Sequence, residues 1–190
     1  MKRILLTLIV AGLLAGCAAQ GGNLRYADGD RPNILIMGED SDPDTVARGG
    51  RIFKRVLDAL AGGMQGEGFN VYDETAVTLD DFTQMRRRRG DAEIIDIARS
   101  VRAVPIDVAV IFAIYPTILE RGHARKIRMR VTGRLLHVRS GRRLGNFETE
   151  SATATALASD CDRDCELERI GSEARNLARD LGAILAKKLD

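Results

Sequence analysis

The sequence has no tryptophan, only two histidines, and an aromatic content of 4% in 190 residues. Surfaces that stack on sugars or bases depend on aromatic rings, so this scarcity disfavours glycan- and nucleic-acid-binding classes. No serine lies in a G-x-S-x-G elbow, and no glycine-rich stretch has the G-K-[ST] ending of a phosphate loop. His123 and His137 lie in no recognisable catalytic motif. We therefore predict surface histidines, no cofactor and no enzymatic activity.

The N-terminal residues form a secretory signal pattern. A basic start, Met1-Lys2-Arg3, precedes an apolar run from Ile4 to Leu14, and the small residues Ala15-Gly16 follow. This order is typical of a cleaved signal peptide, and the run is too short to span a bilayer. The alternative within this pattern is an ordinary signal peptide cut after Ala19.

The residues around Cys17 carry a more specific resemblance. Leu14-Ala15-Gly16-Cys17 is similar to the lipobox of bacterial lipoproteins. Membership of that family implies cleavage before Cys17 and acylation of this cysteine with fatty acids such as palmitate. Because Ala18 rather than an aspartate follows, the resemblance also implies an outer-membrane lipoprotein that faces the periplasm of a Gram-negative cell envelope.

The chain divides into three parts. Residues 1–16 are the predicted signal peptide, 17–31 the lipidated cysteine and a flexible tether, and 32–190 a single domain with a real core. Without Lys2 and Arg3, the 29 basic residues of the chain fall to 27, which equals the 27 acidic residues. A neutral mature chain gives no indication of nucleic acid as a partner.

Cys161 and Cys165 are the two cysteines that remain after Cys17. In an exported protein such a pair indicates a disulfide, and residues four apart on a helical turn lie near the upper limit of its reach. A metal site is the alternative, but His123 and His137 show no ligand spacing to the cysteines. We predict a disulfide and no metal.

Hydrophobic patterning predicts the elements of the domain. A continuous apolar run predicts a strand at 33–37 that is covered on both faces, and Asp44 or Thr45 is expected to cap the next helix, which Gly62-Gly63 and Gly66 end. The expected elements that follow are a strand at 69–72, helical stretches at 82–89 and 93–102, a central strand at 107–115, a hairpin of 126–138 with 144–155, and a closing helix from 167 to 185. The order β-α-β-α-β-β-β-α predicts an α/β (α+β) fold with helices packed on a single mixed sheet.

The hairpin has alternating character. Ile127, Met129, Val131 and Leu135 are expected to point to one face, and the alternating arginines point to the other. Cross-strand ion pairs are predicted between two groups, Arg128, Arg130 and Arg134 on the first strand and Glu148 and Glu150 on the second.

The order of elements, with the segments NILIM, FNVY, DVAVIFAIY and VTGRLLHVRSGRRLGNF, resembles one group of envelope proteins. These are the curli-secretion lipoproteins, the penicillin-binding-protein activator lipoproteins and the amino-terminal domain of the TolB type. Gly133 and Gly141 take the places of the two glycines in the hairpin of that group. The resemblance implies a non-enzymatic role in docking to, or building, a larger envelope machine.

Two groups of arginines are the candidate partner-binding residues. Arg86, Arg87, Arg88 and Arg89 suit an acidic protein, anionic lipid or peptidoglycan, and the hairpin turn contributes Arg139, Arg142 and Arg143. The alternative for the first group is a solvated helix end. An acidic loop at 39–44 is better explained by capping and solvation of a helix start than by calcium.

The sequence therefore predicts a non-catalytic outer-membrane lipoprotein, an adaptor or assembly factor for secretion, for a flagellar or pilus ring, or for peptidoglycan synthesis. Its expected partners are other envelope proteins and the membrane that holds its lipid, and a homo-oligomer is compatible with the sequence. The alternative is a lipoprotein that binds a small ligand or glycan.

Overall fold

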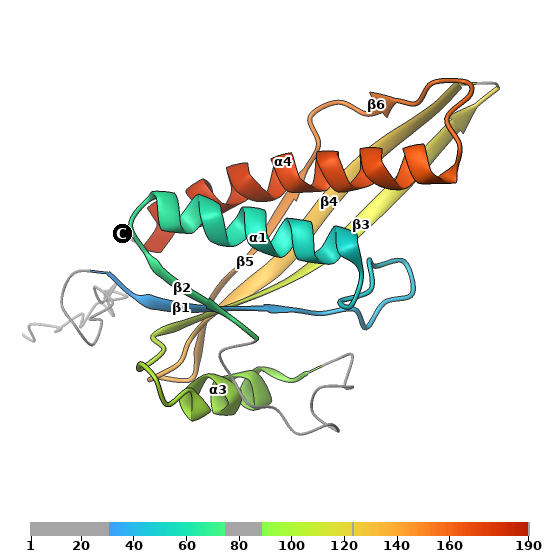
Figure 1. Ribbon diagram of the computed structural model, residues 1–190. Coiled ribbons are helices and arrows are strands. Elements are labelled where there is room, and N and C mark those ends of the chain that lie inside the picture. The colour runs from blue at the N-terminus through green and yellow to red at the C-terminus, as the bar shows by residue number, and fades with distance from the viewer. Residues whose placement is uncertain (1–30, 75–88, 123, 190) are drawn as a thin grey trace, which may run out of the picture.

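The computed structural model describes residues 31–74, 89–122 and 124–189. The described elements are β1 (Asn33–Gly38), α1 (Arg51–Gly66), β2 (Asn70–Asp73), α3 (Asp91–Ser100), β3 (Val108–Arg121), β4 (Ala124–His137), β5 (Arg142–Glu150), β6 (Thr155–Ala156) and α4 (Arg163–Leu189). They form one mixed sheet with helices packed on it (Figure 1). This confirms the predicted fold class, with one short strand, β6, added to the predicted order. Among the described helices, none is both long and apolar enough to cross a membrane.

The strands lie in the order β2-β1-β3-β4-β5, and β6 pairs with β4 beyond the end of β5. β2, β1 and β3 run parallel to one another, whereas β4 is antiparallel to both of its neighbours, β3 and β5. The strand predicted to be central is central, and it continues to Arg121 rather than ending at Tyr115. β3 and β4 consequently form a long hairpin arm that projects beyond the rest of the sheet (Figure 1).

The sheet has helices on both faces, which explains the unbroken apolar run of β1. Ile34 and Ile36 pack with α1 and α4 on one face, and Leu35 and Met37 pack with α3 on the other. Side chains alternate between the faces of a strand, so a strand covered on both sides needs apolar residues at every position.

The helices α1 and α4 run parallel to each other and meet at two glycines. A Cβ placed on Gly63 would lie 2.6 Å from the Arg179 carbonyl oxygen, and one on Gly182 would lie 2.6 Å from the Leu60 carbonyl oxygen. The prediction that Gly62-Gly63 ends the first helix was therefore wrong, because these residues lie inside α1 and Gly63 lets the two backbones approach.

The start of α1 also differs from the prediction. The helix begins at Arg51 after Gly50, with no side-chain cap, so neither Asp44 nor Thr45 caps it. Instead the Asp42 carboxylate accepts a hydrogen bond from the Asp44 amide at 3.0 Å, and the Thr45 hydroxyl donates to the Asp42 carbonyl at 2.6 Å. The polar residues that favour a helix start here stabilise a turn.

The closing helix is confirmed as α4, with a buried stripe that includes Ile170, Ala174, Leu181 and Leu185. Ile184 was expected on that stripe but is 49% exposed. In the hairpin, the predicted ion pairs Arg128–Glu150 and Arg130–Glu148 are present.

Candidate functional site

The candidate partner-binding residues are not alike in the structure. Arg86, Arg87 and Arg88, like Cys17, lie outside the described residues. Arg89 is only 4% exposed, and its guanidinium pairs with Glu74 at 3.3 Å. This burial contradicts the expectation of an exposed docking arginine at position 89.

The arginines of the β4–β5 turn are exposed, as a docking role requires. Arg139 and Arg142 lie in and beside the tight turn, where Gly141 has a positive φ of 69°. Arg143 is 47% exposed at its side chain and pairs with Asp91. The turn therefore offers two arginines to solvent and directs the third toward α3.

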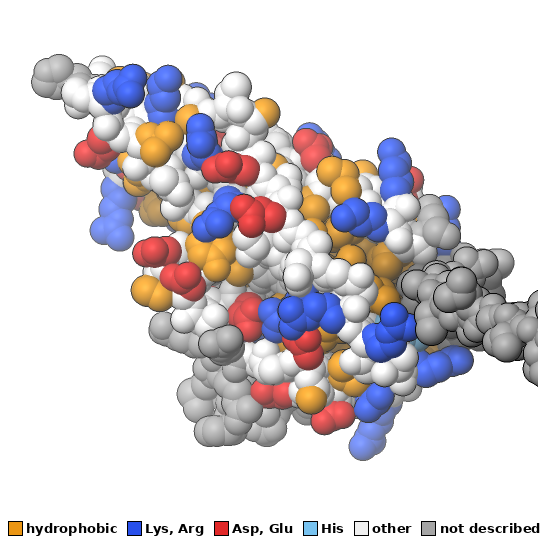
Figure 2. All heavy atoms as spheres, turned by 180° about the vertical axis from the view of Figure 1, so that it is seen from behind, with side chains coloured by type: hydrophobic (Ala, Val, Ile, Leu, Met, Phe, Trp, Pro, Cys, Tyr) orange, Lys and Arg blue, Asp and Glu red, His pale blue; other side chains and the backbone are white. Residues whose placement is uncertain are grey.

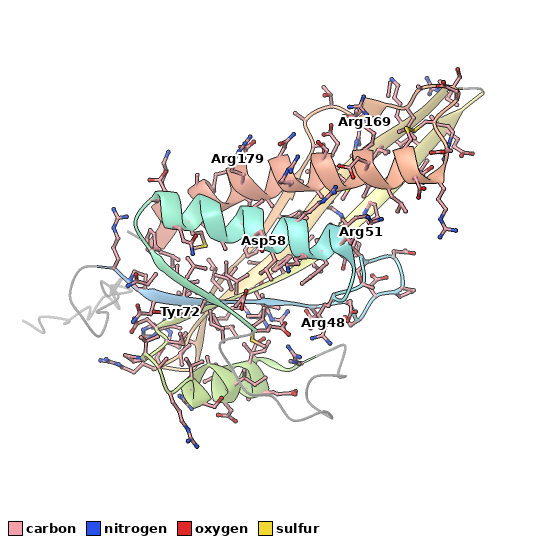
Figure 3. All side chains as sticks on the ribbon, viewed as in Figure 1. Arg48, Arg51, Asp58, Tyr72, Arg169 and Arg179 are labelled. Carbon is pink, nitrogen blue, oxygen red and sulfur yellow. A yellow bond between two sulfur atoms is a disulfide. The ribbon has the colours of Figure 1, made fainter. Side chains whose placement is uncertain are left out.

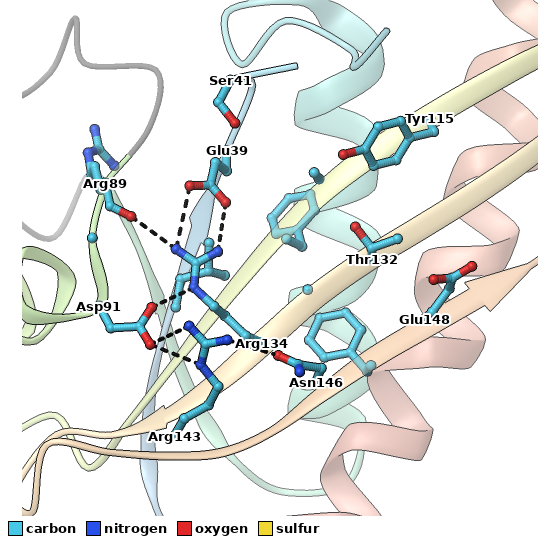
Figure 4. Close-up of a pocket in the computed structure, with 16 residues that line it drawn as sticks. Glu39, Ser41, Arg89, Asp91, Tyr115, Thr132, Arg134, Arg143, Asn146 and Glu148 are labelled. Atoms are coloured by element: carbon cyan, nitrogen blue, oxygen red, sulfur yellow. Dashed lines mark hydrogen bonds and ion pairs between the residues drawn. The ribbon is translucent and has the colours of Figure 1, made fainter.

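A polar hollow of about 780 Å³ lies on the α3 face of the sheet (Figure 4). It opens where β1 ends, beside the first turn of α3, and its floor is formed by β3, β4 and β5. Its polar lining includes Glu39, Ser41, Asp91, Thr132, Arg134, Asn146 and Glu148. Ligands of open α/β sheets bind in the crevice beyond the carboxyl ends of strands, and the hollow lies beyond the carboxyl end of β1.

Arg134 is the centre of this hollow, which the sequence did not indicate. Its Nε donates to Asp91 Oδ1 at 2.8 Å, and its Nη1 donates to Glu39 Oε2 at 2.7 Å. Its Nη2 donates to the carbonyl oxygen of Arg89 at 3.1 Å. One guanidinium thus joins β4 to the end of β1 and to the start of α3 (Figure 4).

The prediction that Arg134 pairs with Glu148 or Glu150 was wrong. In the register, Arg134 lies opposite Asn146, and Glu148 lies opposite Thr132. Arg134 side-chain exposure is 15%, so its charge needs close partners, and the folded chain brings Glu39 and Asp91 to it from distant segments.

A second arginine reaches Asp91 because of an irregularity in the sheet. The β4–β5 pairing shifts register between Leu135, which lies opposite Gly145, and Leu136, which lies opposite Arg143. A bulge reverses the faces of the residues beyond it, so Arg143 points to the α3 side and its Nε donates to Asp91 Oδ2 at 2.9 Å.

Asp91 and Arg134 remain ionised at neutral pH. Burial acts to raise the pKa of Asp91, but hydrogen bonds from Arg143 and Arg134 and their positive charges lower it overall. Burial likewise acts to lower the pKa of Arg134, yet Glu39 and Asp91 raise it overall. The carboxylates and arginines hold one another in place, and this arrangement suits binding better than proton transfer.

A further ion cluster supports the rim of the hollow. Glu74 pairs with Arg89 at 3.3 Å and with Arg48 at 3.6 Å, and Arg48 also pairs with Asp40 at 3.2 Å. The Glu74 carboxylate accepts a hydrogen bond from the Gly38 amide at 3.0 Å. These contacts fix the loop after β1, so the acidic loop at 39–44 pairs with arginines and does not cap a helix.

Beyond α3, the same face of the sheet has no helix over it among the described residues. We call this surface the open face; it consists of Tyr115, Thr117, Arg128, Arg130, Thr132, Asn146, Glu148 and Glu150. Opposite charges are paired along it, Arg128 with Glu150 at 3.7 Å and Arg130 with Glu148 at 3.6 Å. The Arg130 guanidinium also lies 4.6 Å from the centre of the Tyr115 ring. Figure 2 shows basic and acidic side chains next to each other along the projecting arm.

His137 is buried, so the prediction of a surface histidine was wrong at this position; His123 lies outside the described residues. The exposed fraction of His137 is 8%, and its Nδ1 shares a hydrogen bond with the Ser140 hydroxyl at 2.7 Å. Burial lowers its pKa against the opposing effect of Asp107. His137 does not line the hollow.

The predicted disulfide is present between Cys161 and Cys165, whose Cα atoms lie 5.4 Å apart. It joins the segment before α4 to the first turn of that helix. Within the described ranges, no group of three or more His, Cys, Asp or Glu side chains has the arrangement of a metal site.

No family model matches the chain, and no curated protein matches it in sequence. Solved structures share its fold at low identity. The CT253 protein of Chlamydia trachomatis superimposes with a TM-score of 0.53 at 9% identity, covering 83% of this chain and 96% of its own. The lipoprotein GNA1162 of Neisseria meningitidis superimposes with a TM-score of 0.47 at 11% identity, covering 77% of this chain and 98% of its own. The PelC dodecamer of Paraburkholderia phytofirmans superimposes with a TM-score of 0.45 at 13% identity, covering 80% of this chain and 86% of its own.

Of these three proteins, GNA1162 is described as a lipoprotein. The likeness to CT253, at 9% identity, shows the fold alone. None of the three is described as a curli-secretion lipoprotein, a penicillin-binding-protein activator or a TolB domain. The similarity to that narrower group stays a prediction from the sequence.

Proposed function

We propose that this chain is an outer-membrane lipoprotein, acylated at Cys17, whose domain is a non-catalytic adaptor or assembly factor of the cell envelope. The lipid fixes the protein to the membrane, the tether gives it reach in the periplasm, and the open face receives another envelope protein. A secretion channel, a flagellar or pilus ring and a peptidoglycan synthase are the machines that fit such a module.

The open face is the observation that carries this proposal. One side of the sheet is filled by α1 and α4, with residues such as Phe112 and Met129 fully buried beneath them. On the other side α3 covers only the end near Leu35 and Leu136. Among the described residues, a long sheet surface therefore remains accessible on the packed core, and such a surface is a suitable docking platform.

The chemistry of the open face agrees with docking. Cross-strand ion pairs already hold its charged side chains in place, so a partner with a complementary pattern of charges meets an ordered surface. Such charge complementarity contributes chiefly to the specificity and the association rate of binding. Leu119 on the arm is 40% exposed. The outer edge of β5, the last strand in the sheet order, lies beside this face and is suited to strand addition.

Site-specific crosslinking in living cells tests this proposal. A photoreactive residue at Thr117, on the open face, is expected to give one discrete adduct with another envelope protein. The matched control is a photoreactive residue at Asp180, which is 72% exposed on the outer side of α4. Equal adducts from both positions, or extraction only as a lone monomer without adducts, would contradict the proposal. Mass spectrometry of the exported chain, which is expected to show an acylated Cys17 as residue one, tests the anchor separately.

The polar hollow favours a second candidate function, the binding of a small ligand or glycan. Its volume of about 780 Å³ lies within the range of ligand pockets. Its lining is polar rather than the apolar kind that such pockets usually have, which places this candidate second. A Thr132→Tyr substitution would fill the hollow, and it should abolish thermal stabilisation by a peptidoglycan disaccharide if that reading holds. Thr117→Tyr is the control outside the hollow.

A further inference from the structure

We propose that the end of the domain at which the tether enters is a membrane-facing surface that contacts anionic phospholipid headgroups. This inference rests on the proposed lipid anchor and adds the orientation in which the domain faces the bilayer. We call this surface the anchor end; it consists of residues 31–33, 66–70, 101–107, 138–142 and 186–189.

Hydrogen bonds show that the loops of the anchor end lie together. The Asn33 amide donates to Asp107 Oδ2 at 3.0 Å, and the Asn70 side chain donates to Asn33 Oδ1 at 3.1 Å. The Val138 amide donates to the Asp107 carbonyl at 2.9 Å. The starts of β1, β2 and β3 and the β4–β5 turn therefore share one end of the sheet.

All three described helices end on the same side. The contact of Gly63 with Gly182 sets α1 and α4 parallel, so their C-termini lie together. The guanidinium of Arg99, in the last turn of α3, donates to the carbonyl of Val138 at 3.0 Å. Figure 1 shows the start of β1 at this end, opposite the β3–β4 arm.

The anchor end is strongly basic. It carries five exposed basic side chains that make no ion pair within the described ranges: Arg102, Arg139, Arg142, Lys187 and Lys188. The acidic residues described there are Glu67, which is half-buried, and Asp107, which is 6% exposed. Figure 2 shows basic side chains gathered on the right of the view, with few acidic ones among them. Because the mature chain is neutral overall, this is a local concentration of charge.

The tether keeps this surface near the bilayer. Cys17 and Arg31 are separated by the 13 residues from Ala18 to Asp30, which reach at most about 50 Å when extended. Since the tether joins the anchor end itself, folding back is not needed to bring the basic side chains to the headgroups. Attraction to an anionic surface decays over about 8–10 Å at physiological salt, so the tether allows the contact and the charges orient the domain.

An acidic protein or peptidoglycan is the alternative partner of these side chains. The basic residues come from α3, the β4–β5 turn and α4, and they spread over the broad end of the domain. None of these five side chains lines the polar hollow. A broad basic surface at the point where the tether enters matches an extended array of headgroups better.

Vesicle flotation tests the proposal on the full processed chain, residues 17–190, with Cys17→Ser so that no lipid is attached. We expect binding to vesicles of phosphatidylglycerol and phosphatidylethanolamine at low salt, and little binding to phosphatidylcholine vesicles. Each basic residue near an anionic surface contributes about fivefold to binding. Replacing Arg102, Arg139, Arg142 and Lys187 by Gln should therefore weaken binding by at least about 100-fold.

The matched control removes the same charge from the opposite end, with Arg51, Lys54, Arg121 and Lys126 replaced by Gln. All eight residues are exposed, and circular dichroism checks that both variants fold. Retained binding by the control, with loss in the anchor-end variant, supports the proposal. Equal losses, no binding to anionic vesicles at low salt, or binding only to isolated peptidoglycan that the anchor-end variant loses would overturn it. Failure of Cys17 acylation in cells would instead contradict the proposed function, because this assay uses the unacylated chain.

Discussion

At the scale of single residues, Arg134 joins three segments that are far apart in the sequence. Glu39 lies 95 residues and Asp91 lies 43 residues from it. An Arg134→Met variant removes the arginine that pairs with Glu39 and leaves Asp91 with Arg143 alone, and breaking such contacts costs about 2–4 kcal/mol. We expect this loss in the free energy of unfolding, measured by urea denaturation.

The control for this measurement is Arg130→Gln. Arg130 and Glu148 are 41% and 61% exposed at their side chains, and surface pairs of this kind contribute about 0–1 kcal/mol. Similar losses in the two variants would show that Arg134 is not the joining residue that its contacts indicate.

His137 predicts a pH dependence of stability. Burial lowers its folded-state pKa, with Arg139 and Arg142 acting in the same direction and Asp107 opposing. The unfolded chain therefore takes up the proton first as pH falls. The contribution of His137 to the free energy of unfolding is therefore full above the ordinary histidine pKa of about 6.5, and it declines as pH drops below that value. Urea midpoints between pH 7.5 and 5.5 should show this decline.

Replacement of the imidazole tests this assignment directly. His137→Gln should flatten the stability profile over this range, relative to the unchanged chain. A profile that keeps its slope in the His137 variant would assign the effect to other groups.

At the scale of elements, the contact between α1 and α4 depends on a glycine that no helix propensity favours. Gly63→Ala places a Cβ 2.6 Å from the Arg179 carbonyl, and overpacking of this kind costs about 1–3 kcal/mol. Gly62→Ala, one residue earlier, meets nothing within 4 Å and should stabilise the helix by about 0.5–1 kcal/mol. Opposite shifts in melting temperature are the expected result, and two shifts of the same sign would contradict the close packing.

The elements were largely predictable because burial leaves a periodic trace in the sequence. The apolar runs of β1 and β3 and the alternation of β4 each reflect the faces that neighbouring layers cover. The start of α1 was not predictable, because Asp42 and Thr45 serve a turn as readily as a helix cap. The hollow could not be predicted from the sequence either. It forms only where the end of β1, the start of α3 and a bulge in β5 come together in space, and Arg143 reaches Asp91 only because of that bulge.

At the scale of the whole molecule, the absence of tryptophan in the chain allows a direct measurement of orientation. A tryptophan introduced at Arg139, in the anchor end, should be quenched by brominated lipids when the protein is on anionic vesicles. One introduced at Arg121, at the tip of the arm, should not be. Equal quenching at the two positions would mean that the domain has no preferred orientation on the bilayer.

The length of the β3–β4 arm has a consequence for this orientation. β3 runs for 14 residues, from Val108 beside the basic loops to Arg121 at the far tip, and at about 3.3 Å per residue it measures about 46 Å. A domain seated on its charged base would stand upright, with Leu119 and Arg121 held at a set height in the periplasm. The protein would then select partners by elevation as well as by chemistry, since only a structure present at that level meets the tip.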